Sequence, residues 1–213
     1  MNLETSKNLG GIGALLIVIG SIGTFAYGLV GAVGFIGLIF VLIALKGLAD
    51  YYKEAGIFNN ALYGFIASII GGVAAFAVLI VSLINALVQL DITDWTQWAI
   101  QVQNDAAAGD FSALWNLIWP IVIGGIIALV VLFVFAIVSA IFYRKSLSLA
   151  GSKTGVGIFG TAGMLLLIGA ILTIILIGFL IIWIGAILLI VAFFSIKTGQ
   201  TQTPQTPPAP PPS

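Results

Sequence analysis

The sequence contains no histidine and no cysteine, and only 7% of its 213 residues are charged. The absence of both residue types excludes disulfide bonds, thiol catalysis, Ser-His-Asp triads, and zinc or haem held by His or Cys. The scarcity of charge excludes a soluble domain, whose surface carries roughly 25% charged residues. Hydrophobic residues instead make up 61% of the chain, and the mean hydropathy is +1.25. This composition indicates an integral membrane protein.

Four long apolar blocks are separated by short polar segments, and their lengths predict the number of membrane crossings. A helix needs about 20 residues to cross about 30 Å of hydrocarbon. The two outer blocks have about twice this length, so each predicts a helical hairpin, whereas each middle block predicts one long span. We therefore expect an all-α polytopic transmembrane bundle over residues 1–197, arranged as hairpin, two long single spans and hairpin. The six predicted spans are 9–27, 29–48, 57–88, 114–142, 156–176 and 178–196.

Two interpretations of the outer blocks stay open, because neither predicted turn contains a charge. Full crossings would place tight turns near Gly28 and Gly178, where glycine allows a break in the helix. Re-entrant hairpins would bend back before the far side, and their turns would have to be buried in protein. Short similarities between the first and last blocks also leave an internal repeat open, although apolar, glycine-rich segments match one another easily.

The charged residues separate by side, which predicts the orientation. With six crossings, every basic residue falls on the side of the N-terminus: Lys7, Lys46, Lys53, Arg144, Lys145, Lys153 and Lys197. The opposite side receives four acidic residues and no basic one: Asp91, Asp94, Asp105 and Asp110. Short loops rich in Lys and Arg stay in the cytoplasm. We therefore expect a cell-membrane protein with both termini cytoplasmic.

Two inner polar segments hold most of the cations and form a candidate basic cluster. Its members are Lys46, Lys53, Arg144 and Lys145. Such a cluster would attract anionic headgroups or a cytosolic partner. The alternative is ordinary anchoring, in which long basic side chains reach from the ends of the spans to the interface.

The outer loop, 89–113, contains a predicted amphipathic helix. Trp95, Trp98 and Val102 recur at helical spacing on one face, and the opposite face is polar. A helix of this kind lies along a membrane surface. Asp91 or Thr93 would cap its start, and Asp110 would cap the following span. The alternatives are a lid over a central cavity and a group of carboxylates that attracts cations.

Small residues repeat along the third predicted span and mark a candidate helix-packing face. The candidates are Gly64, Ala67, Ser68, Gly71 and Gly72. Small side chains allow helices to approach closely in a membrane. Such a face serves either the packing of the bundle itself or an interface between copies. If the face is a close contact, Gly72→Leu is expected to disrupt folding or assembly.

Residues 198–213 differ from the rest of the chain. The segment holds six of the seven prolines and has no charge and no large apolar side chain. Because it can bury little surface, we expect a disordered, proline-rich tail.

Three segments resemble those of a known family. They are Leu9-Gly10-Gly11-Ile12-Gly13, the run Leu45-Lys46-Gly47-Leu48-Ala49-Asp50-Tyr51-Tyr52, and Gly155-Val156-Gly157-Ile158-Phe159 with the following Thr161-Ala162-Gly163. The chain resembles the domain of unknown function 996 family, small polytopic membrane proteins found mainly in archaea. The resemblance covers nearly the whole chain before the tail, and it implies no activity, ligand or site residue.

No catalytic, cofactor or metal site is predicted, since no nucleophile is paired with a base and no charged residue lies inside the spans away from their ends. We expect a non-enzymatic component that organises the membrane or interacts within it. The alternative is a small channel or facilitator with an uncharged lining. The expected partners are the lipid bilayer and a second copy or another membrane protein, and no nucleic acid.

Overall fold

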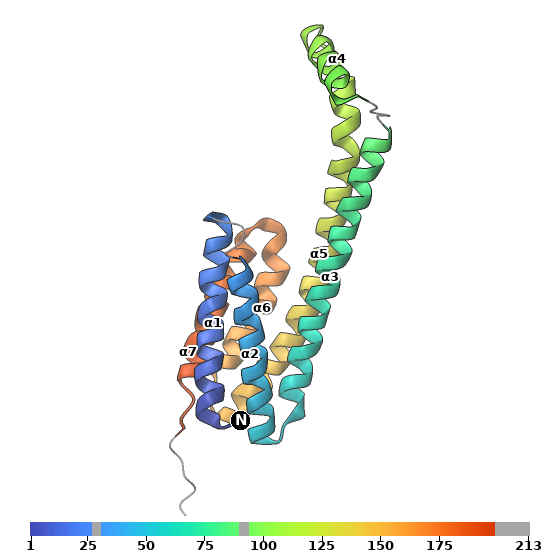
Figure 1. Cartoon of the computed structure of the whole chain (residues 1–213). Coiled ribbons are helices and arrows are strands. Elements are labelled where there is room, and N and C mark those ends of the chain that lie inside the picture. The colour runs from blue at the N-terminus through green and yellow to red at the C-terminus, as the bar shows by residue number, and fades with distance from the viewer. Residues whose placement is uncertain (27–30, 90–93, 199–213) are drawn as a thin grey trace, which may run out of the picture. The chain divides into compact units, whose positions relative to one another are not determined.

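The computed structural model describes residues 1–26, 31–89 and 94–198, and its regular elements there are all helical (Figure 1). The elements are α1 (Leu3–Ala26), α2 (Gly31–Tyr52), α3 (Ala55–Gln89), α4 (Trp95–Ala107), α5 (Ser112–Thr154), α6 (Ile158–Leu172), the 3-10 helix η2 (Thr173–Ile175) and α7 (Ile177–Phe194). Within these residues, six helical segments are long and apolar enough to cross a membrane. The predicted all-α class and the six apolar helices are therefore confirmed.

The chain divides into two compact units. Unit 1 comprises Met1–Ala61, Arg144–Leu165 and Trp183–Ser213, and unit 2 comprises Leu62–Tyr143 and Leu166–Ile182. The basic residues all belong to unit 1, and most of the acidic residues belong to unit 2. Unit 1 contains seven basic and three acidic residues, a net charge of +4, and unit 2 contains four aspartates and no basic residue.

Within unit 1, α1 and α2 lie side by side and approach through glycines (Figure 1). A methyl group on Gly13 would lie 2.7 Å from the carbonyl oxygen of Gly37. About two turns further along α1, a methyl group on Gly20 would overlap the backbone of Gly34. Close backbone contact of this kind gains dispersion energy that lipid tails cannot supply. The glycines thus fix the pairing of the first two helices.

The core of unit 1 is filled by side chains from several helices. The rings of Phe159 and Phe193 are fully buried and meet edge to face, with their centroids 5.0 Å apart, so they join α6 to α7. Leu45 and Leu48 of α2 and Ile57 of α3 are also fully buried. Aromatic pairs in this geometry are favourable beyond the area they bury.

Within unit 2, the link between α6 and α7 corrects one predicted turn. The turn lies at Thr173–Ile175 and Leu176, and Leu176 takes a positive φ of 65°. Gly178 is already inside α7, and a methyl group there would overlap the carbonyl oxygen of Gly169. Gly178 therefore serves close helix contact, and it is not the break in the helix. The other predicted turn, near Gly28, lies outside the described residues, as does nearly all of the predicted tail.

Candidate functional site

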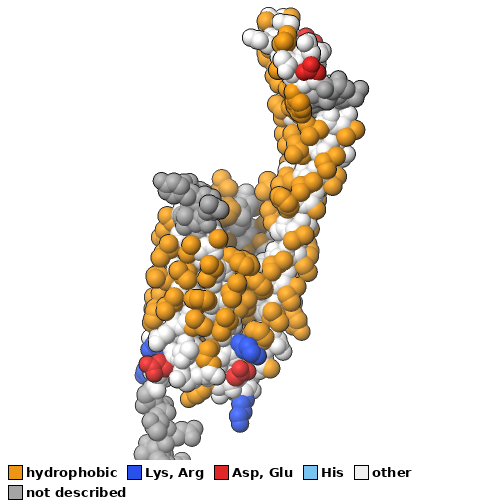
Figure 2. Space-filling view, in the orientation of Figure 1, with side chains coloured by type: hydrophobic (Ala, Val, Ile, Leu, Met, Phe, Trp, Pro, Cys, Tyr) orange, Lys and Arg blue, Asp and Glu red, His pale blue; other side chains and the backbone are white. Residues whose placement is uncertain are grey.

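The basic residues of unit 1 gather at one end of its helices. Lys7, near the start of α1, donates a hydrogen bond of 3.0 Å from Nζ to the carbonyl oxygen of Ile196, which follows α7. The Nζ of Lys46, near the end of α2, lies 5.0 Å from the centre of the Phe58 ring at the start of α3. In Figure 2, the Lys and Arg side chains visible on unit 1 lie at this end, and hydrophobic side chains cover the helices beyond it. The end is therefore cationic and adjoins an apolar surface.

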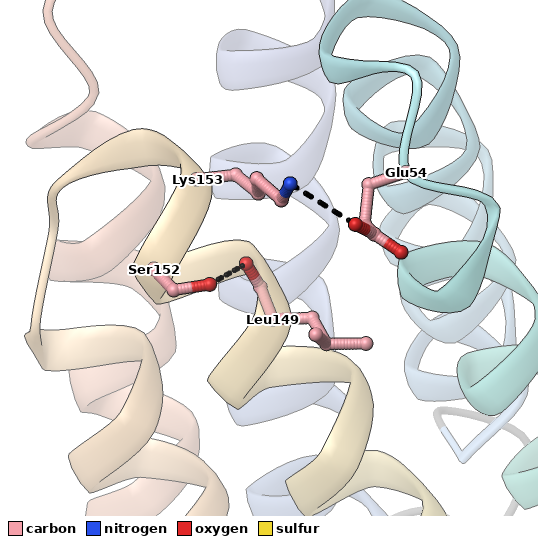
Figure 3. Close-up of polar contacts among 4 residues, drawn as sticks. All are labelled: Glu54, Leu149, Ser152 and Lys153. Atoms are coloured by element: carbon pink, nitrogen blue, oxygen red, sulfur yellow. Dashed lines mark hydrogen bonds and ion pairs between the residues drawn. The ribbon is translucent and has the colours of Figure 1, made fainter.

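One ion pair lies at this end of unit 1. Nζ of Lys153, in the last turn of α5, lies 3.0 Å from Oε2 of Glu54, which lies between α2 and α3 (Figure 3). The side chains keep 42% and 31% of their exposure, so water screens the pair and its contribution to stability is small. Beside it, the hydroxyl of Ser152 donates to the carbonyl oxygen of Leu149 in its own helix (Figure 3). The pair therefore joins the end of α5 to the link between α2 and α3, and Glu54 neutralises the charge of Lys153.

Arg144 and Lys145 lie inside a helix, and not in the loop that the sequence predicts. Helix α5 runs on to Thr154, so these cations lie about 13–15 Å before its end, at 1.5 Å per residue. The helix continues because its next turns are still packed: Leu147 is buried, and a methyl group on Gly163 of α6 would lie 3.1 Å from the Cα atom of Arg144. Both basic side chains are exposed.

The candidate packing residues of α3 divide between two faces. A methyl group on Gly64 would lie 3.1 Å from the carbonyl oxygen of Ser139 in α5, and one on Gly71 would overlap Phe135 of α5. Ala67 is buried as well. These three small residues therefore face α5 within unit 2.

Ser68 and Gly72 lie on the adjoining face of α3, each about 100° around the helix from the neighbouring small residue that faces α5. Both are exposed, and a methyl group on Gly72 would meet nothing within 4 Å among the described residues. The Ser68 hydroxyl donates to the carbonyl oxygen of Phe65 in its own helix at 2.7 Å. Within the chain there is room for a larger side chain at Gly72, so Gly72→Leu tests contact between copies and not the seam with α5.

Two serines of α5 also join it to α3, and the sequence analysis missed their role. Within unit 2, the Ser139 hydroxyl donates to the carbonyl oxygen of Gly64 at 2.8 Å. Within unit 1, the Ser146 hydroxyl donates to the carbonyl oxygen of Ile57 at 2.6 Å. All four atoms belong to buried residues, and both pairs are separated by seven positions on each helix. The only signal in the sequence is this spacing of seven, which keeps two serines on one face of a helix.

Helix α4 carries the three residues predicted for an interfacial helix. Trp95 and Trp98 meet edge to face with ring centroids 5.9 Å apart, and Val102 lies one turn further. The helix has no buried residue. Its N-cap is Asp94, whose Oδ1 accepts hydrogen bonds from the backbone N–H groups of Thr96 and Gln97. The predicted caps, Asp91 and Thr93, lie outside the described residues, and Asp94 replaces them because its carboxylate reaches the free N–H groups of the first turn.

Asp110 caps the start of α5, as predicted. Its Oδ1 accepts a hydrogen bond of 2.9 Å from the backbone N–H of Ser112. This bond, and then the Ser112 hydroxyl, lower the pKa of the Asp110 carboxyl below its ordinary value. In the part of the chain that the structure describes, no three acidic side chains come together in a group that would hold a metal ion. Asp94 and Asp110 thus act at the starts of α4 and α5.

Comparisons with known proteins agree with the resemblance seen in the sequence. The family described as "Protein of unknown function (DUF996)" matches residues 33–187. Uncharacterized protein MJ1644 of Methanocaldococcus jannaschii is 26% identical over 197 residues, which cover 92% of this chain and 94% of that protein. No solved structure matches the chain. Because the family match covers well over half of its length, the chain belongs to the DUF996 family.

Proposed function

We propose that this protein is a non-enzymatic, multi-pass component of the cell membrane that organises the bilayer or binds partner proteins through its helix faces. Its partners are the lipid bilayer and, through the exposed face of α3, a second copy or another membrane protein. Both termini lie in the cytoplasm. The six apolar helices are consistent with a membrane protein. The proposal adds the role of the protein, the side of the membrane on which its termini lie, and its partners.

One observation carries the proposal: two buried serine hydroxyls within the helices join one helix to its neighbour. The hydroxyls of Ser139 and Ser146 bind carbonyl groups of the neighbouring α3. Those of Ser21, Ser82 and Thr173 bind carbonyl groups three or four residues back in their own helices. A hydroxyl bonded to a neighbouring helix helps to hold the two helices together, whereas one bonded to its own helix only satisfies its own hydrogen bond. The arrangement supports a structural role for the helices.

The exposed face of α3 supports contact with another membrane protein. Ser68 and Gly72 lie on it four residues apart, and Phe76, 64% exposed, follows at the same spacing. Residues at i, i+4 and i+8 share one face of a helix. A second helix could approach closely at the two small residues and cover the ring.

The proposed sidedness has a direct test, because the natural chain contains no cysteine. Single-cysteine variants at Gln103, exposed in α4, and at Ser152, exposed near the end of α5, report the two sides. We expect a membrane-impermeant maleimide added to intact cells to label Gln103→Cys alone, and both variants after the cells are opened. Labelling of Ser152→Cys from outside would overturn the cytoplasmic placement of the termini.

The proposed partner is tested by cross-linking between copies. Gly72→Cys is expected to form a disulfide-linked dimer in membranes under mild oxidation. Ile70→Cys is the matched control, since Ile70 is 50% exposed but lies about 200° around α3 from Gly72 at 3.6 residues per turn. Equal cross-linking of the two variants would indicate random collision and refute a specific interface.

The role itself is tested in proteoliposomes. Purified protein is expected to leave the permeability of the vesicles to ions and small neutral solutes unchanged. Sustained flux of any solute would overturn the non-enzymatic organising role and favour a channel or facilitator. Vesicles that contain Gly71→Ala, a variant with a disturbed α3–α5 seam, control for leakage through misfolded protein.

A further inference from the structure

We propose that the link between α6 and α7 lies within the hydrocarbon of the bilayer, where its exposed apolar side chains contact the acyl chains of the lipids. The α6–α7 hairpin therefore ends inside the membrane, without a loop in the water beyond it. The inference rests on the membrane location in the proposed function. It does not depend on the side of the membrane on which the termini lie, or on contact between copies.

The hairpin tip, residues 173–180, has large exposed side chains that are all apolar. Each of them is at least 55% exposed: Ile174, Ile175, Leu176, Ile177, Phe179 and Leu180. The one polar side chain of the tip, Thr173, donates its hydroxyl to the carbonyl oxygen of Gly169 at 2.8 Å. The link between α2 and α3, by contrast, contains Lys53 and Glu54. A continuous apolar surface without a free polar side chain favours hydrocarbon over water.

Leu176, at the turn itself, takes a backbone conformation that is unfavourable for leucine. Its φ is 65°, in the left-handed region that glycine enters without the clash of a Cβ atom. Its side chain is 74% exposed, so packing within the described chain does not offset that clash. Contact with acyl chains gives this side chain a role that glycine or asparagine, the usual residues of turns in water, could not fill.

The backbone at the turn is paired, as hydrocarbon requires. Leu176 is the single residue outside a helix between α6 and α7, because η2 continues directly from α6. Its N–H donates to the carbonyl oxygen of Thr173 at 3.0 Å, and its carbonyl oxygen accepts a hydrogen bond of 3.2 Å from the N–H of Phe179. Leu176 therefore needs neither water nor a covering protein to satisfy its backbone.

The lengths of the two helices agree with a tip inside the hydrocarbon. The apolar spans Ile158–Ile175 and Ile177–Phe194 have 18 residues each. At 1.5 Å per residue, and about 2 Å in η2, each span measures about 27–29 Å, whereas the hydrocarbon of a typical bilayer is about 30 Å thick. Lys153 precedes the first span and Lys197 follows the second, so these cations hold the other end of the hairpin at the near interface. A tip at this distance stays just inside the far edge of the hydrocarbon.

Single-cysteine variants of the full chain, which has no natural cysteine, test the proposal. Ile174→Cys and Leu176→Cys are expected to resist a membrane-impermeant maleimide in intact and in opened cells, and to be labelled once detergent dissolves the membrane. Gln103→Cys, at an exposed position on α4, is the control that water reaches. Labelling of the tip variants from either side of the membrane would place the turn in water and overturn the proposal.

A spin label on the same thiols distinguishes acyl chains from protein. Oxygen concentrates in hydrocarbon and a nickel chelate stays in water, so labels at the tip are expected to collide more with oxygen, and a label on Gln103→Cys more with the chelate. Protection of the tip labels from both reagents would mean that a second copy or another protein covers the tip, against the lipid assignment. Labelling of Gln103→Cys only in opened cells, with the tip unlabelled, would refute the proposed sidedness and support the position of the tip.

Discussion

Replacing Gly71 by alanine is expected to destabilise the protein, whereas the same replacement at the adjacent Gly72 is not. A methyl group on Gly71 would overlap the Cβ atom of Phe135 and lie 2.8 Å from its Cγ atom. A methyl group on Gly72 would have open space around it in the described chain. The two variants add the same group to the same helix, so their difference isolates the contact with α5.

The expected size of that difference follows from the geometry. Carbon atoms reach their best separation at about 3.5–4.0 Å, so α3 and α5 must separate by roughly 1 Å at Gly71, or the Phe135 ring must leave its position. Forced overpacking of this kind costs about 1–3 kcal/mol. Alanine also favours a helix by about 1 kcal/mol relative to glycine, and this gain is common to both variants. Gly71→Ala should therefore be about 1–3 kcal/mol less stable than Gly72→Ala.

Thermal unfolding in detergent, followed by the fluorescence of the five tryptophans, measures this difference. One kcal/mol corresponds to about 2–4 °C for a chain of this length, so the two midpoints should differ by about 2–12 °C. Phe135→Leu combined with Gly71→Ala should recover part of the loss, because it removes the ring that the new methyl group meets. Equal midpoints for the two alanine variants would refute the assignment of Gly71 to the α3–α5 seam.

Three further predictions concern buried and capping polar groups. Ser146→Ala removes the buried hydrogen bond to Ile57 and should lower the stability by about 0.6–1.7 kcal/mol, measured by the same unfolding assay; no change would show that the bond contributes nothing. Asp94→Ala should speed hydrogen exchange across the first turn of α4 through the loss of a cap worth about 1 kcal/mol, while Asp94→Asn should preserve most of the protection. Because the folded-state pKa of Asp110 is lowered, its cap on α5 should persist above the ordinary carboxyl pKa and be lost as the pH falls through the lowered value. The amide signal of Ser112 reports this titration, and a midpoint at or above the ordinary value would contradict the prediction.

The number and type of helices could be predicted from the sequence for a physical reason. Inside a bilayer each backbone group must be paired within its own segment, so an apolar block of sufficient length becomes a helix whatever its neighbours are. The position of α4 was predictable in the same way, because Trp95, Trp98 and Val102 repeat at helical spacing and flanking polar residues interrupt the long apolar blocks. The separation of basic from acidic residues is equally a property of the sequence.

Where the helices end and which of their faces are packed could not be predicted from hydropathy, because both depend on contacts between helices. The charges at Arg144 and Lys145 predicted the end of a span, yet α5 continues because Leu147 is buried against its neighbours. Gly71 and Gly72 are equivalent in any pattern of small residues, and only the position of α5 assigns one to a contact and the other to an open face.

The sequence alone thus determined where the chain becomes helical and where its charges lie, since both follow from each segment's own preference for lipid or water. The tertiary structure decided which face of each helix is covered. The hydrogen bonds that align α3 with α5 join residues 75 and 89 positions apart. Helix faces within a membrane are all apolar, so hydropathy does not distinguish a face that meets lipid from one that meets another helix, and close packing makes that choice.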